Sequence, residues 1–124
     1  MTKKILVADD EPNIVISLEY LLKREGYTVL VARDGQEALN SITREKPDLV
    51  LLDVMMPIKT GLEVLQAVRA SDELRLTKIL MLTAKGRDTD VTKGLALGAD
   101  AYMTKPFSTR ELVEKVADLL AALP

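Results

Sequence analysis

The sequence predicts an α/β domain with a doubly wound, five-stranded parallel sheet in the order 2-1-3-4-5 and five helices. Short apolar runs alternate along the chain with segments whose apolar residues recur at helical spacing, which is the pattern of βα units closing into a parallel sheet. The runs are apolar on both faces, as expected when helices cover both sides of a sheet. The 124 residues fit one domain, 1–124, with a single core.

Five apolar runs are predicted to form the strands. Each is three or four residues long, and all are composed of aliphatic residues, methionine or tyrosine. The predicted strands are residues 5–8, 29–32, 49–52, 79–82 and 101–103.

The first two helices have recognisable starts. Pro12 suits the first turn of a helix that ends near Gly26. Asp34 and Glu37 open the second helix at capping-box spacing, and this helix must end before Pro47. The apolar residues that we assign to the core are Ile14, Val15, Leu18, Leu21 and Leu22 in the first helix and Ala38, Leu39 and Ile42 in the second.

The last three helices are less uniform. The third begins at about Gly61, and the fourth spans roughly 86–97 and stops at Gly98. The fifth begins with a second capping box formed by Ser108 and Glu111. The inward residues are predicted to be Leu62, Leu65 and Val68, then Val91 and Leu95, then Leu112, Val113, Val116, Leu119, Leu120 and Leu123. The outward residues are predicted to be Leu97 on the fourth helix and Glu111, Glu114, Lys115 and Asp118 on the fifth.

The composition excludes several kinds of chemistry. The chain has no cysteine, which removes disulfides and thiolate metal sites and suits a reducing cytoplasm. It has no histidine, which removes the usual zinc ligand and the usual general base. The net charge of -2 gives no basic footprint, so we expect no direct binding of nucleic acid by this chain. Its first apolar run stops at acids, which indicates a strand rather than a signal peptide, and no stretch is long enough to span a membrane.

Chemistry-bearing residues follow four of the predicted strands. Asp9 and Asp10 follow the first, Asp53 the third and Thr83 the fourth, while Lys105 comes shortly after the fifth. Parallel strands end at one edge of the sheet, and open α/β sheets bind their ligands just beyond that edge. The sequence therefore predicts that three acids, a hydroxyl and an ammonium group converge there.

This set of side chains favours phosphoryl chemistry with a metal ion. Packed carboxylates repel one another, so they either take up protons or bind a cation. Oxygen ligands without histidine or cysteine favour a hard divalent ion, and Mg²⁺ in particular pairs with phosphate. Lys105 can pair with a phosphoryl oxygen and Thr83 can donate to one. Asp53 is the candidate nucleophile, because its strand lies in the middle of the predicted sheet.

Four segments resemble the receiver domain of two-component response regulators, which has the flavodoxin-like fold. The similarity covers essentially the whole chain, and the motifs occur in the order and spacing of that family. They are Asp9-Asp10-Glu11-Pro12, Leu51-Leu52-Asp53-Val54-Met55-Met56-Pro57, Leu82-Thr83-Ala84 and Gly98-Ala99-Asp100-Ala101-Tyr102-Met103-Thr104-Lys105-Pro106-Phe107.

The resemblance implies a role for each acid. Asp53 would accept a phosphoryl group from a phosphohistidine on a sensor histidine kinase or a histidine phosphotransfer protein. Asp10 would be a direct Mg²⁺ ligand together with Asp53, Asp9 would reach the metal mainly through water, and the backbone carbonyl of Met55 would complete the set.

The resemblance also implies how the site holds the phosphoryl group and how phosphorylation changes the surface of the domain. Thr83 and the backbone N–H of Ala84 would hold phosphoryl oxygens, and Lys105 would pair with another after a Lys-Pro bond that is usually cis. Tyr102 would turn inward when Thr83 follows the phosphate. That movement would change the surface formed by the fourth helix, fifth strand and fifth helix, where a downstream protein target binds.

Some positions depart from the family pattern. Lys59 and Thr60 make the loop after the acceptor more basic than usual, because many relatives carry an acid before the glycine. Ala101 replaces an acid and Lys115 an arginine that are frequent in DNA-binding winged-helix regulators. We therefore expect a monomer, or a weak dimer that depends on phosphorylation.

Two apolar side chains of the first helix do not fit its core stripe. Ile16 and Tyr20 project away from Leu18. Exposed apolar residues are common and need no function. The alternative hypothesis is that both contact the kinase or phosphotransfer protein.

Three functions remain open. The leading hypothesis is a phosphorylation-driven switch without an output domain of its own, which is not a turnover enzyme. An alternative is the isolated N-terminal receiver of a larger regulator with a DNA-binding or enzymatic output domain. A remote alternative is a Mg²⁺-dependent aspartyl phosphatase, which would need an acid where Met55 stands. A nucleotide or flavin carrier is weaker still, because no glycine-rich loop follows the first strand.

Overall fold

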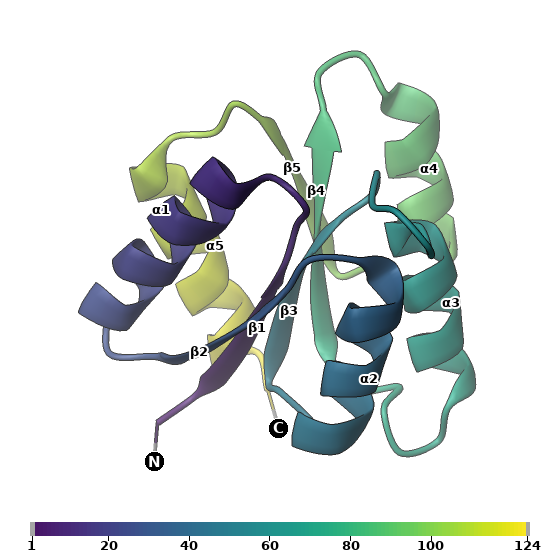
Figure 1. The fold of residues 1–124 in the computed structure, drawn as a ribbon, viewed down its shortest axis with the longest axis horizontal. Helices are drawn as coiled ribbons and strands as arrows, with labels where there is room; N and C mark the ends of the chain where they lie inside the picture. Colours follow the sequence, from purple (N-terminus) through teal and green to yellow (C-terminus); the bar gives the residue numbers. More distant parts are fainter. Residues whose placement is uncertain (1, 124) are drawn as a thin grey trace.

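A parallel sheet forms the centre of the computed structural model, which describes residues 2–123. The strand order is β2-β1-β3-β4-β5, with one helix after each strand (Figure 1), so the predicted fold class and order are confirmed. The elements are β1 (Lys4–Ala8), α1 (Pro12–Arg24), β2 (Thr28–Ala32), α2 (Gly35–Glu45), β3 (Leu49–Asp53), α3 (Gly61–Ala70), β4 (Lys78–Ala84), α4 (Asp88–Ala96), β5 (Ala101–Lys105) and α5 (Thr109–Ala121).

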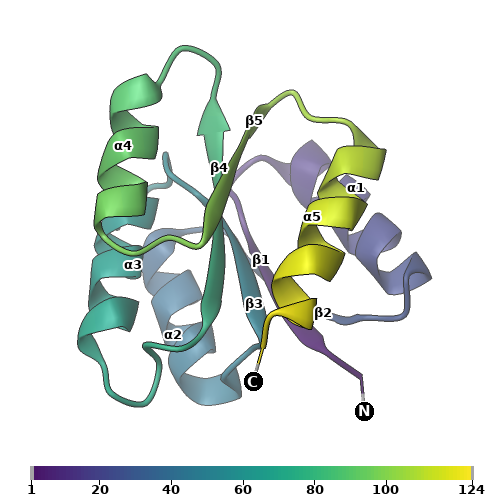
Figure 2. The same cartoon turned by 180° about the vertical axis from the view of Figure 1, so that it is seen from behind.

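The helices form a layer on each face of the sheet. Helices α1 and α5 cover one face, and α2, α3 and α4 cover the other (Figures 1 and 2). Strand β3 shows the alternation that this arrangement requires, because Leu49 and Leu51 belong to the core under α1 and α5 while Val50 and Leu52 belong to the opposite core. All of β3 is therefore buried. None of the helices within residues 2–123 is long and apolar enough to cross a membrane.

The register of the sheet aligns the ends of its strands. Ala8 pairs with Ala32 on one side and with Leu52 on the other. Asp53 pairs with Leu82, and Ala84 pairs with Lys105. The carboxyl ends of all five strands thus meet at one edge, which we call the carboxyl edge.

Strands β3, β4 and β5 continue further toward this edge than their apolar runs predict, whereas β1 and β2 end at the predicted residues. Asp53 and Lys105 are the last residues of β3 and β5, and Thr83 and Ala84 are the last two of β4. Asp53, Thr83 and Lys105 were predicted to follow their strands but are therefore part of the sheet's hydrogen-bonding ladder, whereas Asp9 and Asp10 follow β1 as predicted.

Side-chain caps begin α2 and α5 where the sequence predicts them. Asp34 accepts a hydrogen bond from the backbone N–H of Glu37, and Ser108 accepts one from that of Glu111. Pro12 is the first residue of α1, as predicted. The full capping box of α3, formed by Thr60 and Glu63, was not predicted.

The predicted inward face of α4 is wrong. Leu95 was assigned to the core but is 45% exposed, whereas Leu97 was placed outside and packs against the core. The buried residues of α4 are Asp90 and Gly94. The buried face of α4 carries an acid and a glycine, which are not apolar side chains. A prediction based on the spacing of apolar residues therefore assigned the wrong face to the core.

Candidate functional site

Three carboxylates converge at the carboxyl edge. One oxygen from each of Asp9, Asp10 and Asp53 lies within 4.8 Å of the others. Asp9 and Asp53 are buried at the carboxyl ends of the adjacent strands β1 and β3, and Asp10 is exposed. The sequence predicted this convergence from the strand ends alone. Such a group of oxygen donors fits a hard divalent cation.

Lys105 places a positive charge among these carboxylates. Its Nζ donates to Asp9 Oδ2 at 2.7 Å and to Glu11 Oε1 at 3.1 Å, and it lies 3.6 Å from Asp53 Oδ1. The Lys105–Pro106 peptide bond is cis, as expected. Burial alone lowers the pKa of Lys105, but the hydrogen bond to Asp9 and the charge of Asp53 outweigh it and raise the pKa above its usual value. The ammonium group therefore keeps its charge at neutral pH.

Asp53 is buried among charges of its own sign. Burial raises the pKa of its carboxyl to about 7, the charges of Asp9 and Asp10 act in the same direction, and Lys105 and the Met55 amide act against them. The Met55 N–H donates to Asp53 Oδ1 at 3.3 Å. A carboxyl with this pKa is substantially protonated at neutral pH, and an added cation would favour its charged form.

Thr83 has an unused hydrogen-bonding group. It is 1% exposed, and its hydroxyl oxygen has no hydrogen-bond partner within residues 2–123. A buried hydroxyl without a partner carries a desolvation cost of about 1–3 kcal/mol. Because Thr83 is next to the end of β4, beside β3, this cost falls at the carboxyl edge. The buried hydroxyl thus lacks a partner close to the end of the strand next to Asp53.

The comparison with protein families decides what kind of domain this is. The model of the response regulator receiver domain matches residues 5–117. The chain belongs to the response-regulator receiver family.

Relatives agree with this assignment. The receiver domain is 52% identical over 120 residues to the alkaline phosphatase synthesis transcriptional regulatory protein PhoP of Bacillus subtilis (strain 168). This match covers 97% of the chain but 49% of PhoP, so the chain spans about half the length of that curated relative.

Solved structures share the fold closely. The chemotaxis response regulator CheY4 of Vibrio cholerae is 34% identical, with a TM-score of 0.90 over 96% of this chain and 99% of CheY4. The receiver domain of sensor histidine kinase PA1611 from Pseudomonas aeruginosa PAO1 is 29% identical, with a TM-score of 0.90 over 98% of this chain and 100% of that one. The PA1611 structure has a magnesium ion coordinated in its active-site cleft.

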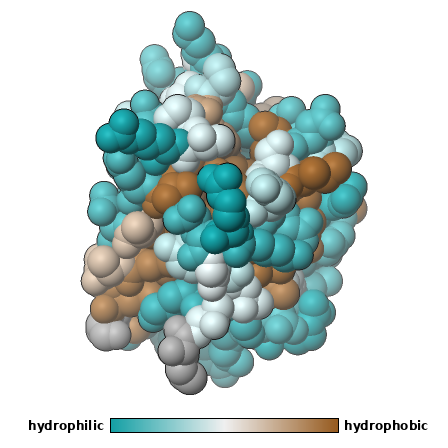
Figure 3. Space-filling view, turned by 90° about the vertical axis from the view of Figure 1, so that its left-hand side faces the viewer, coloured by the Kyte–Doolittle hydropathy of each residue, from teal (hydrophilic) through white to brown (hydrophobic). Residues whose placement is uncertain are grey.

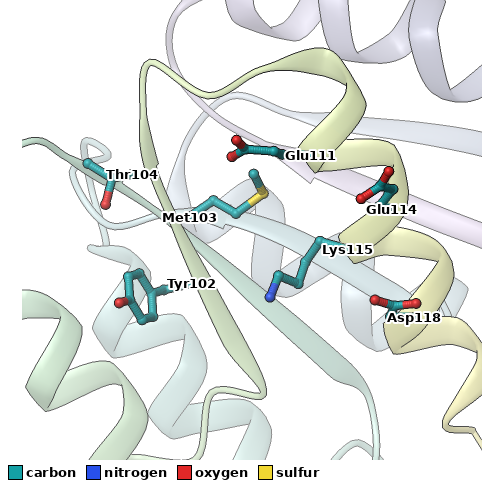
Figure 4. Close-up of a pocket in the computed structure, with 7 residues that line it drawn as sticks. All are labelled: Tyr102, Met103, Thr104, Glu111, Glu114, Lys115 and Asp118. Atoms are coloured by element: carbon teal, nitrogen blue, oxygen red, sulfur yellow. The ribbon is translucent and has the colours of Figure 1, made fainter.

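A groove lies beside the site of the receiver domain, between β5 and α5 (Figure 4). It is lined by Tyr102, Met103, Thr104, Glu111, Glu114, Lys115 and Asp118. Tyr102 pairs with Met81 in the register and is 44% exposed, so its ring is accessible at this surface. Three acids and one lysine give the α5 side a negative charge, and the acids project outward as predicted.

One contact at the site was missed by sequence reasoning. Glu11 was given no role of its own beyond the Asp9-Asp10-Glu11-Pro12 motif, yet its carboxylate accepts a hydrogen bond from Lys105. Its place directly after the acid pair is the signal that could have found it.

The two apolar residues of α1 are exposed as predicted. Ile16 is 61% and Tyr20 is 68% exposed, and the guanidinium of Arg24 lies 6.0 Å from the centre of the Tyr20 ring. On the side of the molecule that carries α1 and α5, hydrophobic side chains occur in separate areas among hydrophilic ones (Figure 3). Docking of a phosphoryl donor on Ile16 and Tyr20 stays a prediction.

Proposed function

We propose that this receiver domain is a phosphorylation-driven switch in which Asp53 accepts a phosphoryl group from a phosphohistidine. The donor is a sensor histidine kinase or a histidine phosphotransfer protein. The observation that carries the proposal is the position of Lys105 Nζ, which lies 2.7 Å from Asp9 and 3.6 Å from Asp53 at the edge where the unpartnered hydroxyl of Thr83 also lies. These groups provide a nucleophile, a cation and a donor for one phosphoryl group.

The chemical step uses these residues in turn. A carboxylate oxygen of Asp53 forms a bond to phosphorus while the bond from phosphorus to the imidazole nitrogen breaks and leaves its electron pair on that nitrogen. Lys105 pairs with one phosphoryl oxygen, and the Thr83 hydroxyl and the Ala84 N–H donate to others. Asp53 must be unprotonated to attack, so any interaction that lowers its raised pKa assists the reaction.

The acid group is suited to Mg²⁺. Both oxygens of Asp9 already have partners, since Oδ1 accepts from the Glu11 N–H at 2.9 Å and Oδ2 binds Lys105. We therefore assign Asp10, Asp53 and the backbone carbonyl of Met55 as direct ligands and Asp9 as an indirect one. When bound, Mg²⁺ would neutralise charge between the carboxylates and the phosphoryl oxygens. The magnesium site of the PA1611 receiver supports this assignment.

Phosphorylation of Asp53 changes the shape of one surface of the domain. Thr83 moves toward the phosphoryl group, and Tyr102 turns inward into the space that Thr83 leaves. The surface formed by α4, β5 and α5 then binds a downstream protein, with the acidic groove along α5 as part of it. We propose a monomer, or a weak dimer on phosphorylation, in the cytoplasm.

Two forms of the proposal differ in what the switch controls. Either the domain acts alone on a partner protein, or it is the N-terminal receiver of a larger regulator with a DNA-binding or enzymatic output domain. The 49% coverage of PhoP favours the second form. In neither form is the domain a turnover enzyme, since the acid that an aspartyl phosphatase requires is replaced by Met55.

Intact mass after incubation with acetyl phosphate tests the proposal, with and without Mg²⁺. We expect a single phosphoryl adduct on the wild type that requires Mg²⁺ and is lost in Asp53→Asn. Asp72→Asn, which alters an exposed acid in the α3–β4 connection, is the matched control and should retain the adduct. An adduct that persists in Asp53→Asn would contradict the proposal.

A further inference from the structure

Arg69, in the last turn of α3, joins three segments of the chain at the edge of the sheet opposite the carboxyl edge. Its Nε donates to the carbonyl of Gly98 at 2.8 Å, and one terminal nitrogen donates to the carbonyls of Arg75 at 3.0 Å and Thr77 at 2.7 Å. The other terminal nitrogen donates to Asp100 Oδ2 at 2.8 Å. A single planar guanidinium therefore holds together α3, the α3–β4 connection and the α4–β5 connection. We call Arg69 and these four acceptors the arginine clamp.

Asp100 extends the arginine clamp to the sheet. Its Oδ2 also accepts from the N–H of Ile79 at 2.8 Å, and its own N–H donates to the carbonyl of Ile79 at 3.0 Å. Its Oδ1 lies 3.7 Å from Nζ of Lys78, the first residue of β4. The side chains of Arg69 and Asp100 are 19% and 26% exposed, so water screens this ion pair less than a surface pair. The start of β5 is thus fixed against the start of β4.

The α4–β5 connection has room for the arginine because of its glycine. Gly98 has a φ of 105°, and a Cβ there would lie 3.2 Å from both Cγ and Nε of Arg69, closer than an ordinary contact. The N–H of Ala99 donates to the carbonyl of Gly94 at 2.9 Å and closes the end of α4. Leu97 packs against the core at the same end. The carboxyl-terminal end of α4 is therefore capped, packed and bound to Arg69.

The amino-terminal end of α4 has weaker attachments. Arg87 stands at its N-cap, and the guanidinium pairs with Asp90 in the first turn, so this contact stays within the helix. The buried residues of α4 are Asp90 and Gly94, and neither supplies an apolar side chain to the core. The β4–α4 connection leads to this end directly from Thr83 and Ala84 at the carboxyl edge (Figure 2). Helix α4 is thus anchored most firmly at the end that lies away from the proposed phosphoryl site.

We propose that Arg69 is a positioning residue that fixes the carboxyl-terminal end of α4, so that α4 pivots at Gly98 when Asp53 is phosphorylated. The amino-terminal half of the helix moves with Thr83. The start of β5 stays in place and keeps Tyr102 in register with β4. The inference rests on the proposed function, because it requires phosphorylation to move the surface that includes α4.

Amide hydrogen exchange measured by mass spectrometry tests the inference, with and without acetyl phosphate and Mg²⁺ in the labelling buffer. Arg69→Met keeps an unbranched apolar stem and removes the guanidinium. Arg75→Met is the matched control, because it makes the same change at an exposed arginine whose carbonyl, rather than its side chain, contacts Arg69. Val15→Ala removes buried methyl groups from the core on the opposite face of the sheet, and it controls for a general loss of stability.

Phosphorylation of the wild type should change exchange by about tenfold in residues 86–92 and leave residues 96–100 within about twofold. In Arg69→Met, the change on phosphorylation should extend at similar size to residues 96–100, because the hydrogen bonds that hold this end are lost. Arg75→Met and Val15→Ala should keep the wild-type pattern. If Arg69→Met does not fold, Arg69→Lys should show the same extension to a smaller degree, because an ammonium group cannot bind all four acceptors.

Two results would overturn the inference while the proposed function stands. One is a change on phosphorylation that is equal at both ends of α4 in the wild type. The other is a pattern of change that the substitution of Arg69 leaves as in the wild type. Failure of acetyl phosphate to modify Asp53 in the wild type would instead overturn the proposed function.

Discussion

Asp53 and Lys105 lie 3.6 Å apart at the carboxyl edge, yet burial and the charge of Asp9 raise the pKa of Asp53 to about 7. The folded protein thus holds a proton on Asp53 that the unfolded chain releases near pH 4. Stability from this group is full below pH 4 and is lost as the pH rises toward 7. At neutral pH and without a divalent cation, the ionised carboxylate of Asp53 therefore lowers the free energy of unfolding.

Asp53→Asn should therefore stabilise the metal-free protein in a pH-dependent way. The gain in the free energy of unfolding over the wild type should grow between pH 4 and pH 7 by a few kcal/mol, up to about 4, and level off above pH 8. Urea unfolding in the presence of a chelator, at pH 5 and pH 8, measures this difference. A gain that is equal at both pH values would contradict the raised pKa of Asp53.

Thr83→Val separates stability from signalling at a single residue. Valine has the shape of threonine without the unpartnered hydroxyl, so we expect the free energy of unfolding to rise by about 1 kcal/mol. Asp53 should still be phosphorylated, but the ¹⁹F NMR signal of fluorotyrosine at Tyr102 should no longer shift on phosphorylation. A loss of stability would mean that the hydroxyl is satisfied in the folded state.

At the scale of elements, α4 is the helix whose packing the sequence does not reveal. Its buried positions are Asp90, which pairs with Arg87, and Gly94, which faces Met81 and Leu62. An acidic residue in a helix is predicted to be exposed to solvent, and Asp90 is buried because it pairs with Arg87. The starts of α2 and α5, by contrast, follow from local side-chain hydrogen bonds and were predictable.

Gly94→Ala tests the observed packing of α4. A Cβ at this position would lie 3.5 Å from Met81 and 3.8 Å from Leu62, which are ordinary contacts. Alanine is the better helix former, so the free energy of unfolding should rise by about 0.5–1 kcal/mol. Gly35→Ala should instead destabilise the protein, because its Cβ would meet the Lys59 carbonyl. Urea midpoints of the two variants measure both effects, and destabilisation by Gly94→Ala would contradict the packing.

At the scale of the whole molecule, the topology of the sheet brings the site together. Asp9 follows β1, Asp53 ends the neighbouring central strand β3, and Lys105 reaches both from the edge strand β5. The alternation of strands and helices predicts this arrangement, because parallel strands end at one edge. The strand order and the convergence of the acids with Lys105 could therefore be predicted from the sequence.

Other parts of the site depend on geometry that a sequence pattern does not carry. The contact of Glu11 with Lys105 depends on how α1 leaves the sheet. Ile58 has a positive φ of 72° in a connection where a Cβ on Gly35 would lie 1.9 Å from the carbonyl oxygen of Lys59. Neither feature has a signal in the local sequence, and a positive φ is least expected at a β-branched residue such as isoleucine.

The identity of the acceptor is the central claim, and chemical mapping tests it most directly. Borohydride reduction converts an aspartyl phosphate into homoserine, which peptide mass spectrometry can locate. After treatment with acetyl phosphate and Mg²⁺, we predict homoserine at position 53 alone. Homoserine at Asp9 or Asp10, or none in a folded protein that has taken up phosphate, would contradict the assignment of Asp53.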